Sequence, residues 1–161
     1  MRTPFSLFRE DRGQSLIEFA LILPILLLLV TGLIDAARAI WEENTLAYAA
    51  REGTRYAIVH GSAGSPIAWP GSPTVSQCSS SGSFPTCQPV FDAVRNNALG
   101  VANVNVTVTW PDTSGGTTCY DRGCRVTVDA TAPFVPLPSQ YLIAGAFTVT
   151  LKGGSQLYIQ R

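Results

Sequence analysis

The sequence is poor in charge and in the side chains that most enzymes use for catalysis. Only 14% of its 161 residues are charged, and 11 basic residues balance 11 acidic ones. This composition lacks the basic footprint by which proteins hold nucleic acid, so no nucleic-acid partner is expected. The chain has one histidine, His60, and no G-x-S-x-G motif, no phosphate-binding glycine loop with lysine and no metal-binding histidine pair. We therefore expect no enzyme, no metal site and no cofactor.

A long uncharged run near the N-terminus is the clearest feature that is present. Residues 19–34 carry no charge, and adding residues 14–18 gives 21 residues at the cost of one carboxylate, Glu18. A helix of that length rises about 31 Å, close to the thickness of the hydrocarbon core of a bilayer. The run is therefore predicted to be a transmembrane helix over residues 14–34. Positive charges precede it, which places the N-terminus in the cytoplasm and everything after Ile34 outside: Arg2, Arg9 and Arg12.

Three interpretations of this N-terminus assign different fates to the apolar run. A secretory signal peptide would be cleaved at a small-x-small site, Ala-Arg-Ala at 37–39, but a glutamate at its start and Pro24 inside it argue against this. A plain signal anchor would stay uncleaved. A prepilin-type leader, residues 1–13, would be cleaved after Gly13. We favour the leader, because it alone explains why Glu18 occupies the fifth position of the mature chain.

The segment from Gly13 to Ala57 resembles a known family in three places. These are the entry RGQSLIEFAL, the turn LILP and the exit AAREGTRYA. They are similar to the N-terminal module of TadE-like proteins, the pseudopilins or minor pilins of the tight-adherence pilus system. The resemblance implies that a prepilin peptidase cleaves after Gly13. It also implies that the new α-amino group of Gln14 engages Glu18, within or between subunits, during assembly.

Further residues of the helix take roles from the same resemblance. Phe19 lies in register with Gly13 and Glu18, and Pro24 matches a proline associated with local melting of pilin helices in the filament. On the residues alone, Pro24 removes a helix hydrogen bond and should kink or loosen the helix, although membrane helices also tolerate ordinary prolines. An ionised carboxylate at a bilayer edge is unfavourable without a partner; the alternative is that Glu18 only snorkels to the headgroups. Gly13, likewise, could be a flexible linker.

Helical periodicity continues beyond the apolar run, as an amphipathic extension over residues 35–60. Opposite charges stand three residues apart at Asp35 and Arg38, and again at Glu52 and Arg55. Such a helix would measure about 70 Å in all, the shape of a filament subunit. A stripe of small residues, which permits close helix packing, lies on one face: Ala50, Gly53, Thr54 and Ala57.

The remainder of the chain predicts a loop and then a small domain. Residues 61–89 contain four glycines, five prolines and eight serines, a composition typical of a loop or linker. Residues 90–161 are predicted to form a small α+β extracytoplasmic domain. It starts with a short helix that has Pro89 near its first turn and Gly100 as its stop.

Alternating apolar residues in this domain predict antiparallel strands. Strands are expected over residues 103–110 and 126–130, joined by a hairpin loop. A third begins at Phe147, and at Gly153-Gly154 it either turns into a fourth strand or, as we favour, continues with a bulge or kink. The fold class is α+β: a long transmembrane-to-amphipathic helix packed on a sheet of three or four strands, pilin-like.

Four cysteines lie outside the predicted membrane segment. An even number in so small an extracytoplasmic domain favours two disulfides. Among three connectivities we predict local pairing, Cys78 with Cys87 and Cys119 with Cys124, because each pair brackets a glycine-containing loop. A four-cysteine zinc site is the alternative, but neither spacing is C-x-x-C and the compartment is oxidising.

The sequence and the resemblance together predict a pilin-like structural component of a tight-adherence, type IV-like pilus or of its assembly apparatus. It would act by helix-mediated packing against other pilin or pseudopilin subunits. The expected place is the bacterial inner membrane, spanned once, or the cell-surface pilus. The alternative is a membrane-anchored extracytoplasmic adhesin or binding module, which would present the Thr/Asn face of its strands.

Overall fold

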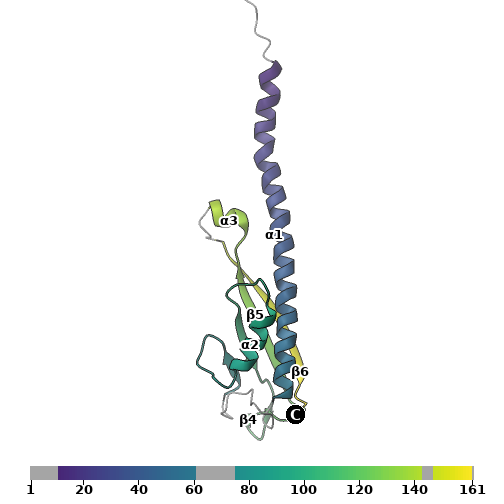
Figure 1. The fold of residues 1–161 in the computed structure, drawn as a ribbon, viewed down its shortest axis with the longest axis vertical. Coiled ribbons are helices and arrows are strands. Elements are labelled where there is room, and N and C mark those ends of the chain that lie inside the picture. The colour runs from purple at the N-terminus through teal and green to yellow at the C-terminus, as the bar shows by residue number, and fades with distance from the viewer. Residues whose placement is uncertain (1–10, 61–74, 143–146, 161) are drawn as a thin grey trace, which may run out of the picture.

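The computed structural model describes residues 11–60, 75–142 and 147–160, and it is dominated by one long helix, α1. This helix runs over Asp11–Val59, 49 residues. Its C-terminal half packs on a small sheet, and its N-terminal half extends beyond the sheet (Figure 1). The predicted α+β class is confirmed.

Helix α1 is continuous through Pro24, which lies inside it. It begins at Asp11 among the described residues, so Gly13 lies within its first turns and not in a linker before it. The helix ends one residue earlier than expected, at Val59, and the ring of His60 lies against the carbonyl oxygen of Tyr56 at 2.9 Å. Gly61, the expected helix stop, lies outside the described residues.

The main sheet has four antiparallel strands in the order β1-β2-β5-β6. Their bounds are Gln77–Ser79 for β1, Asn105–Thr109 for β2, Arg125–Phe134 for β5 and Val149–Tyr158 for β6. The loop between β2 and β5 carries a two-stranded ribbon of β3, Thr113–Ser114, and β4, Thr117–Thr118. The predicted sheet is therefore present, with its fourth strand supplied by residues 77–79, within the segment where composition indicates a loop.

The C-terminal strand β6 is a single strand, as favoured from the sequence, but it has no bulge. All ten of its residues pair one to one with β5, from Val149 opposite Phe134 to Tyr158 opposite Arg125. Gly153 lies instead where β6 packs closely against α1. A Cβ atom added to Gly153 would lie 2.2 Å from the backbone nitrogen of Ala47 in α1. Glycine at 153 therefore permits a close approach of β6 to α1.

The core lies between one face of the sheet and two helices, α1 and α2. Helix α2 spans Gln88–Asn97, with Pro89 in its first turn as predicted, and Gly100 follows it with φ of 75°. Strands β2 and β5 bury alternate residues, as their sequence pattern predicts. The buried side chains include Leu46 and Ala49 of α1, Val90, Phe91 and Val94 of α2, Val106 and Val108 of β2, and Val126, Val128, Ala130 and Ala132 of β5.

A third helix, α3, follows β5 over Leu137–Leu142 and is not apparent from the sequence pattern. It lies beside α1 at the end of the domain nearest the apolar half of that helix (Figure 1).

Candidate functional site

The segment predicted for processing and assembly lies on an exposed part of α1. A Cβ atom added to Gly13 would meet no atom within 4 Å. The side-chain amide nitrogen of Gln14 donates a hydrogen bond to Oε1 of Glu18 at 3.2 Å. Residues four apart share one helix face. The structure therefore brings Gln14 and Glu18 together, while the rest of the domain lies far along the helix (Figure 1).

The apolar side chains that follow Glu18 are also exposed. Phe19 has 62% of its surface exposed, and the most apolar stretch of α1 has none of its residues buried within the described protein. A helix that is apolar on all sides and uncovered suits the interior of a bilayer. This single N-terminal helix fits a single-pass membrane anchor.

The stripe of small residues, in contrast, is covered within the chain. Ala50, Gly53, Thr54 and Ala57 are all buried. A Cβ atom on Gly53 would lie 2.3 Å from a methyl group of Val94 in α2, and the hydroxyl of Thr54 donates to the carbonyl oxygen of Ala50 at 2.7 Å. The stripe therefore packs α1 onto its own α2 and sheet, whereas the apolar N-terminal half of α1 stays exposed.

A polar cluster marks the point where α1 leaves its apolar run. Asp35, which is only 7% exposed, accepts a hydrogen bond from the backbone nitrogen of Leu137 at 2.8 Å. Its other oxygen lies 3.4 Å from the guanidinium of Arg38, which itself lies 3.8 Å from Glu42. The predicted pair of Asp35 and Arg38 is thus present. The bond from Asp35 to Leu137 holds α3 against α1, 102 residues away in sequence.

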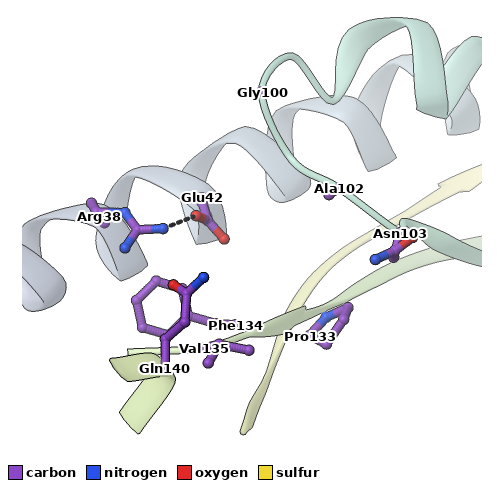
Figure 2. Close-up of a pocket in the computed structure, with 9 residues that line it drawn as sticks. All are labelled: Arg38, Glu42, Gly100, Ala102, Asn103, Pro133, Phe134, Val135 and Gln140. Atoms are coloured by element: carbon purple, nitrogen blue, oxygen red, sulfur yellow. Dashed lines mark ion pairs between the residues drawn. The ribbon is translucent and has the colours of Figure 1, made fainter. Parts of the chain in front are cut away.

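A cleft of about 540 Å³ opens beside this cluster. Figure 2 shows Arg38 and Glu42 of α1 on one side, Asn103 and Pro133 on the other, and Gln140 of α3 near Phe134. The guanidinium of Arg38 lies 5.4 Å from the centre of the Phe134 ring, within cation–π range. With one cation, one carboxylate and mainly neutral walls, the cleft has no strong preference for an anion or a cation.

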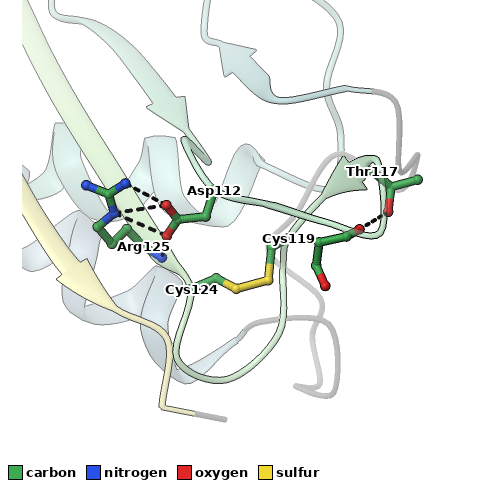
Figure 3. Close-up of a disulfide and its surroundings, with 6 residues drawn as sticks. Asp112, Thr117, Cys119, Cys124 and Arg125 are labelled. Carbon is green, nitrogen blue, oxygen red and sulfur yellow. Dashed lines mark hydrogen bonds and ion pairs between the residues drawn. A yellow bond between two sulfur atoms is a disulfide. The ribbon is translucent and has the colours of Figure 1, made fainter.

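Both predicted disulfides are formed. Cys78 of β1 is joined to Cys87, the residue that precedes α2, with Cα atoms 6.5 Å apart. Cys119 is joined to Cys124 across the loop before β5, with Cα atoms 6.0 Å apart (Figure 3). Because the cysteines form two separate bonds, they do not make a four-cysteine zinc site. No other cluster able to hold a metal occurs among residues 11–60, 75–142 and 147–160.

An ion pair next to the second disulfide fixes the start of β5. The guanidinium of Arg125 donates to the carboxylate of Asp112 at 2.6 and 3.0 Å, and the backbone nitrogen of Arg125 donates to it at 2.6 Å (Figure 3). These hydrogen bonds hold the pKa of Asp112 below its usual value, and the carboxylate raises the pKa of Arg125. The pair lies at the start of β5, at the opposite end of that strand from α3.

The sequence pattern does not reveal several of these positions. It indicates Asp35 only as the partner of Arg38, because nothing local to Asp35 indicates a contact with Leu137. Asp112 and Arg125 are 13 residues apart and carried no pattern. At Gly153 the sequence pattern predicts a turn or bulge, which the structure does not contain. The pair Gly153-Gly154 does carry a signal for the close approach of α1, because glycines inside a strand indicate either a bulge or a close approach of another backbone.

The fold and these side chains define a class: an α+β protein whose exposed, apolar N-terminal helix fits a single-pass membrane anchor. Within the sequence, residues 13–55 match the family described as TadE-like protein. This match confirms the resemblance seen in the motifs. It includes Ala50, Gly53 and Thr54 of the buried stripe but ends before Ala57. No curated protein and no solved structure matches the chain.

Proposed function

We propose that this protein is a pilin-like structural component of a tight-adherence pilus or of its assembly apparatus. The observation that carries the proposal is the register of Gly13, Gln14 and Glu18 at the exposed end of α1, inside the segment that matches the TadE-like family. The apolar half of the helix would leave the bilayer only by packing against similar helices of other pilin subunits.

The different burial of the two halves of α1 supports this proposal. The C-terminal half of the helix fills the core of its own domain, whereas residues 13–30 are exposed all round. Removal of the apolar half from lipid would leave a large uncovered apolar surface, which is unfavourable in water. Bundled helices of neighbouring subunits are the natural replacement for lipid.

In the mature chain, Gln14 would become the first residue after a prepilin peptidase cleaves at Gly13. The open surroundings of Gly13 suit a peptidase that needs an accessible bond. The new α-amino group would then lie in the same turn as the Gln14 amide that already contacts Glu18 at 3.2 Å. A carboxylate has about four lone-pair sites, so Glu18 can accept from an amine of its own or of a neighbouring subunit in addition to this amide.

The proposed topology places the N-terminus in the cytoplasm and the sheet outside the inner membrane. The basic residues before α1 support this orientation. The two disulfides support it as well, because such bonds persist in oxidising compartments.

Processing gives the first test. Protein purified from its native host should begin at Gln14, and Gly13→Phe should leave the leader attached. A chain that begins at Ile40 would identify a cleaved signal peptide, and an intact Met1 would identify a plain anchor. Either result contradicts the proposal.

Assembly gives the second test, with a matched pair of variants. Glu18→Gln should preserve insertion into the membrane but reduce incorporation into pili and co-purification with other pilin subunits. Glu43→Gln, an exposed glutamate of the same helix beyond the apolar run, should change neither. Equal incorporation of both variants would show that Glu18 only snorkels to the headgroups, and would leave an anchored adhesin as the better description.

A further inference from the structure

Helix α3 lies directly beyond the end of the predicted membrane span. Every residue of α1 from 13 to 30 is exposed, but Thr31 is partly covered and Asp35 is buried. The span predicted from the sequence continues to Ile34. The hydroxyl of Thr31 contacts only carbonyl groups of its own helix, so the globular domain begins to cover α1 at Asp35, directly after the span.

The element that contacts α1 at this point is α3. The hydrogen bond from the Leu137 backbone nitrogen to Asp35, at 2.8 Å, attaches the start of α3 to the first polar residue after the span. Figure 1 shows α3 as the part of the domain nearest the apolar half of α1. If α1 crosses a bilayer, α3 must therefore lie at the surface of that bilayer.

The chain around α3 is suited to that position. Residues 130–151 contain no Asp, Glu, Lys or Arg, so none of them carries a charge that lipid would reject. Phe147, just before β6, has 58% of its surface exposed, and Val149 has 40%. Aromatic and apolar side chains of this kind are favoured at the level of the headgroups, where their rings leave water without entering the hydrocarbon centre.

We propose that Leu137–Leu142 together with Phe147, here called the α3 foot, lie in the headgroup layer of the leaflet from which α1 emerges. The occupant of this surface is phospholipid. The foot makes a second contact with the membrane, in addition to α1, and prevents the domain from tilting about the point where the helix leaves the bilayer. The proposal rests on the membrane anchor alone and not on a role in a pilus.

The experiment uses the full chain in nanodiscs of phosphatidylcholine, with both disulfides intact and one added cysteine that carries a nitroxide. The cysteine replaces Gln140 on the foot, Thr117 on the distal β3–β4 ribbon, or Leu27 in the apolar run; all three positions are exposed. Paramagnetic resonance then compares collisions with oxygen, which concentrates in lipid, and with a water-soluble nickel chelate. Leu27→Cys should favour oxygen and Thr117→Cys should favour nickel.

The proposal expects the ratio of oxygen to nickel collisions at Gln140→Cys to lie between the ratios at Leu27→Cys and Thr117→Cys, because the headgroup layer admits less of the nickel chelate than water does. A ratio at Gln140 equal to that at Thr117 would overturn the proposal, as would a probe shielded from both reagents, which would lie against protein and not against lipid. A Leu27 probe outside lipid would overturn the membrane anchor as well. The Leu27 probe therefore distinguishes failure of the anchor from failure of the α3 foot alone.

A matched pair of substitutions then tests the contribution of the foot. Phe147 and Tyr158 are similarly exposed, at 58% and 59%, but Tyr158 lies at the opposite end of β6. In the Gln140→Cys background, Phe147→Glu should shift the probe toward nickel, because a carboxylate is rejected by the headgroup boundary. Tyr158→Glu should leave the probe unchanged. Equal effects of the two substitutions, or none from Phe147→Glu, would contradict a lipid contact at the foot.

Discussion

Substitution of Gly153 by alanine should strongly destabilise the domain, because the new methyl group meets backbone and not side chain. The added Cβ atom would lie 2.2 Å from the nitrogen of Ala47 and 2.4 Å from the carbonyl carbon of Leu46. Ordinary contact begins at 3.4 Å, so α1 and β6 would have to separate by 3.4 − 2.2 = 1.2 Å. Overpacking of this kind costs about 1–3 kcal/mol, occasionally more.

Gly154→Ala is the matched control, because the neighbouring glycine faces the other side of the sheet. Its Cβ atom would meet only the carboxylate oxygen of Asp129, at 2.6 Å, and that exposed side chain can rotate away. Alanine also restricts the unfolded chain, a gain of about 0.4–1 kcal/mol where the backbone accepts it. Gly154→Ala should therefore be neutral or slightly stabilising.

Thermal unfolding of the two full-length variants in detergent, followed by circular dichroism, measures the difference. For a folded unit of about 100 residues, 1 kcal/mol shifts the midpoint by roughly 4 °C or more. Gly153→Ala should thus melt at least about 4 °C below the native chain, and Gly154→Ala close to it. Equal midpoints for the two variants would refute the close approach of β6 to α1 as the reason for glycine at 153.

Three further predictions concern the ends of the domain. Hydrogen bonds from Arg125 hold the pKa of Asp112 below its usual value. The stabilisation from this pair should therefore be present above about pH 4 and lost as the pH falls below it. In thermal melts, Asp112→Asn should be less stable than the native chain at neutral pH, and the difference should disappear in acid. The disulfides close loops of 10 and 6 residues, each of which predicts about 2–3 kcal/mol of stabilisation. The native chain should therefore melt at a lower temperature after reduction. Because its cysteines are paired, it should also have no free thiols and be insensitive to chelators. Asp35→Ala removes the carboxylate that accepts the hydrogen bond from the Leu137 nitrogen, and such a charge-assisted bond is worth about 1.5–3 kcal/mol. Exchange of the Leu137 amide hydrogen should therefore be faster by roughly tenfold or more. Unchanged exchange would show that α3 is held by other contacts.

The sequence alone determined the elements whose signal is periodic or local. An apolar run followed by a 3.6-residue pattern predicts α1, and strict alternation around Val106 and Val128 predicts the strands that the structure contains. The disulfides were also predictable, because cysteines separated by 9 and 5 residues close short loops whichever way the distant chain packs. The register of Gly13 and Glu18 likewise needs no tertiary information, since both lie on one uninterrupted helix.

Only the tertiary structure decided which surfaces those elements use. The stripe around Gly53 could have faced another subunit, and its contact with Val94 of α2 is what assigns it to the interior. Strand β1 forms within a serine-rich segment because pairing with β2 and the bond from Cys78 to Cys87 outweigh its low intrinsic preference. The approach of Gly153 to Ala47 and the bond from Leu137 to Asp35 each join residues more than 100 positions apart. Contacts of that separation leave no periodic trace in the sequence, because their energy is gained only after the whole chain has packed.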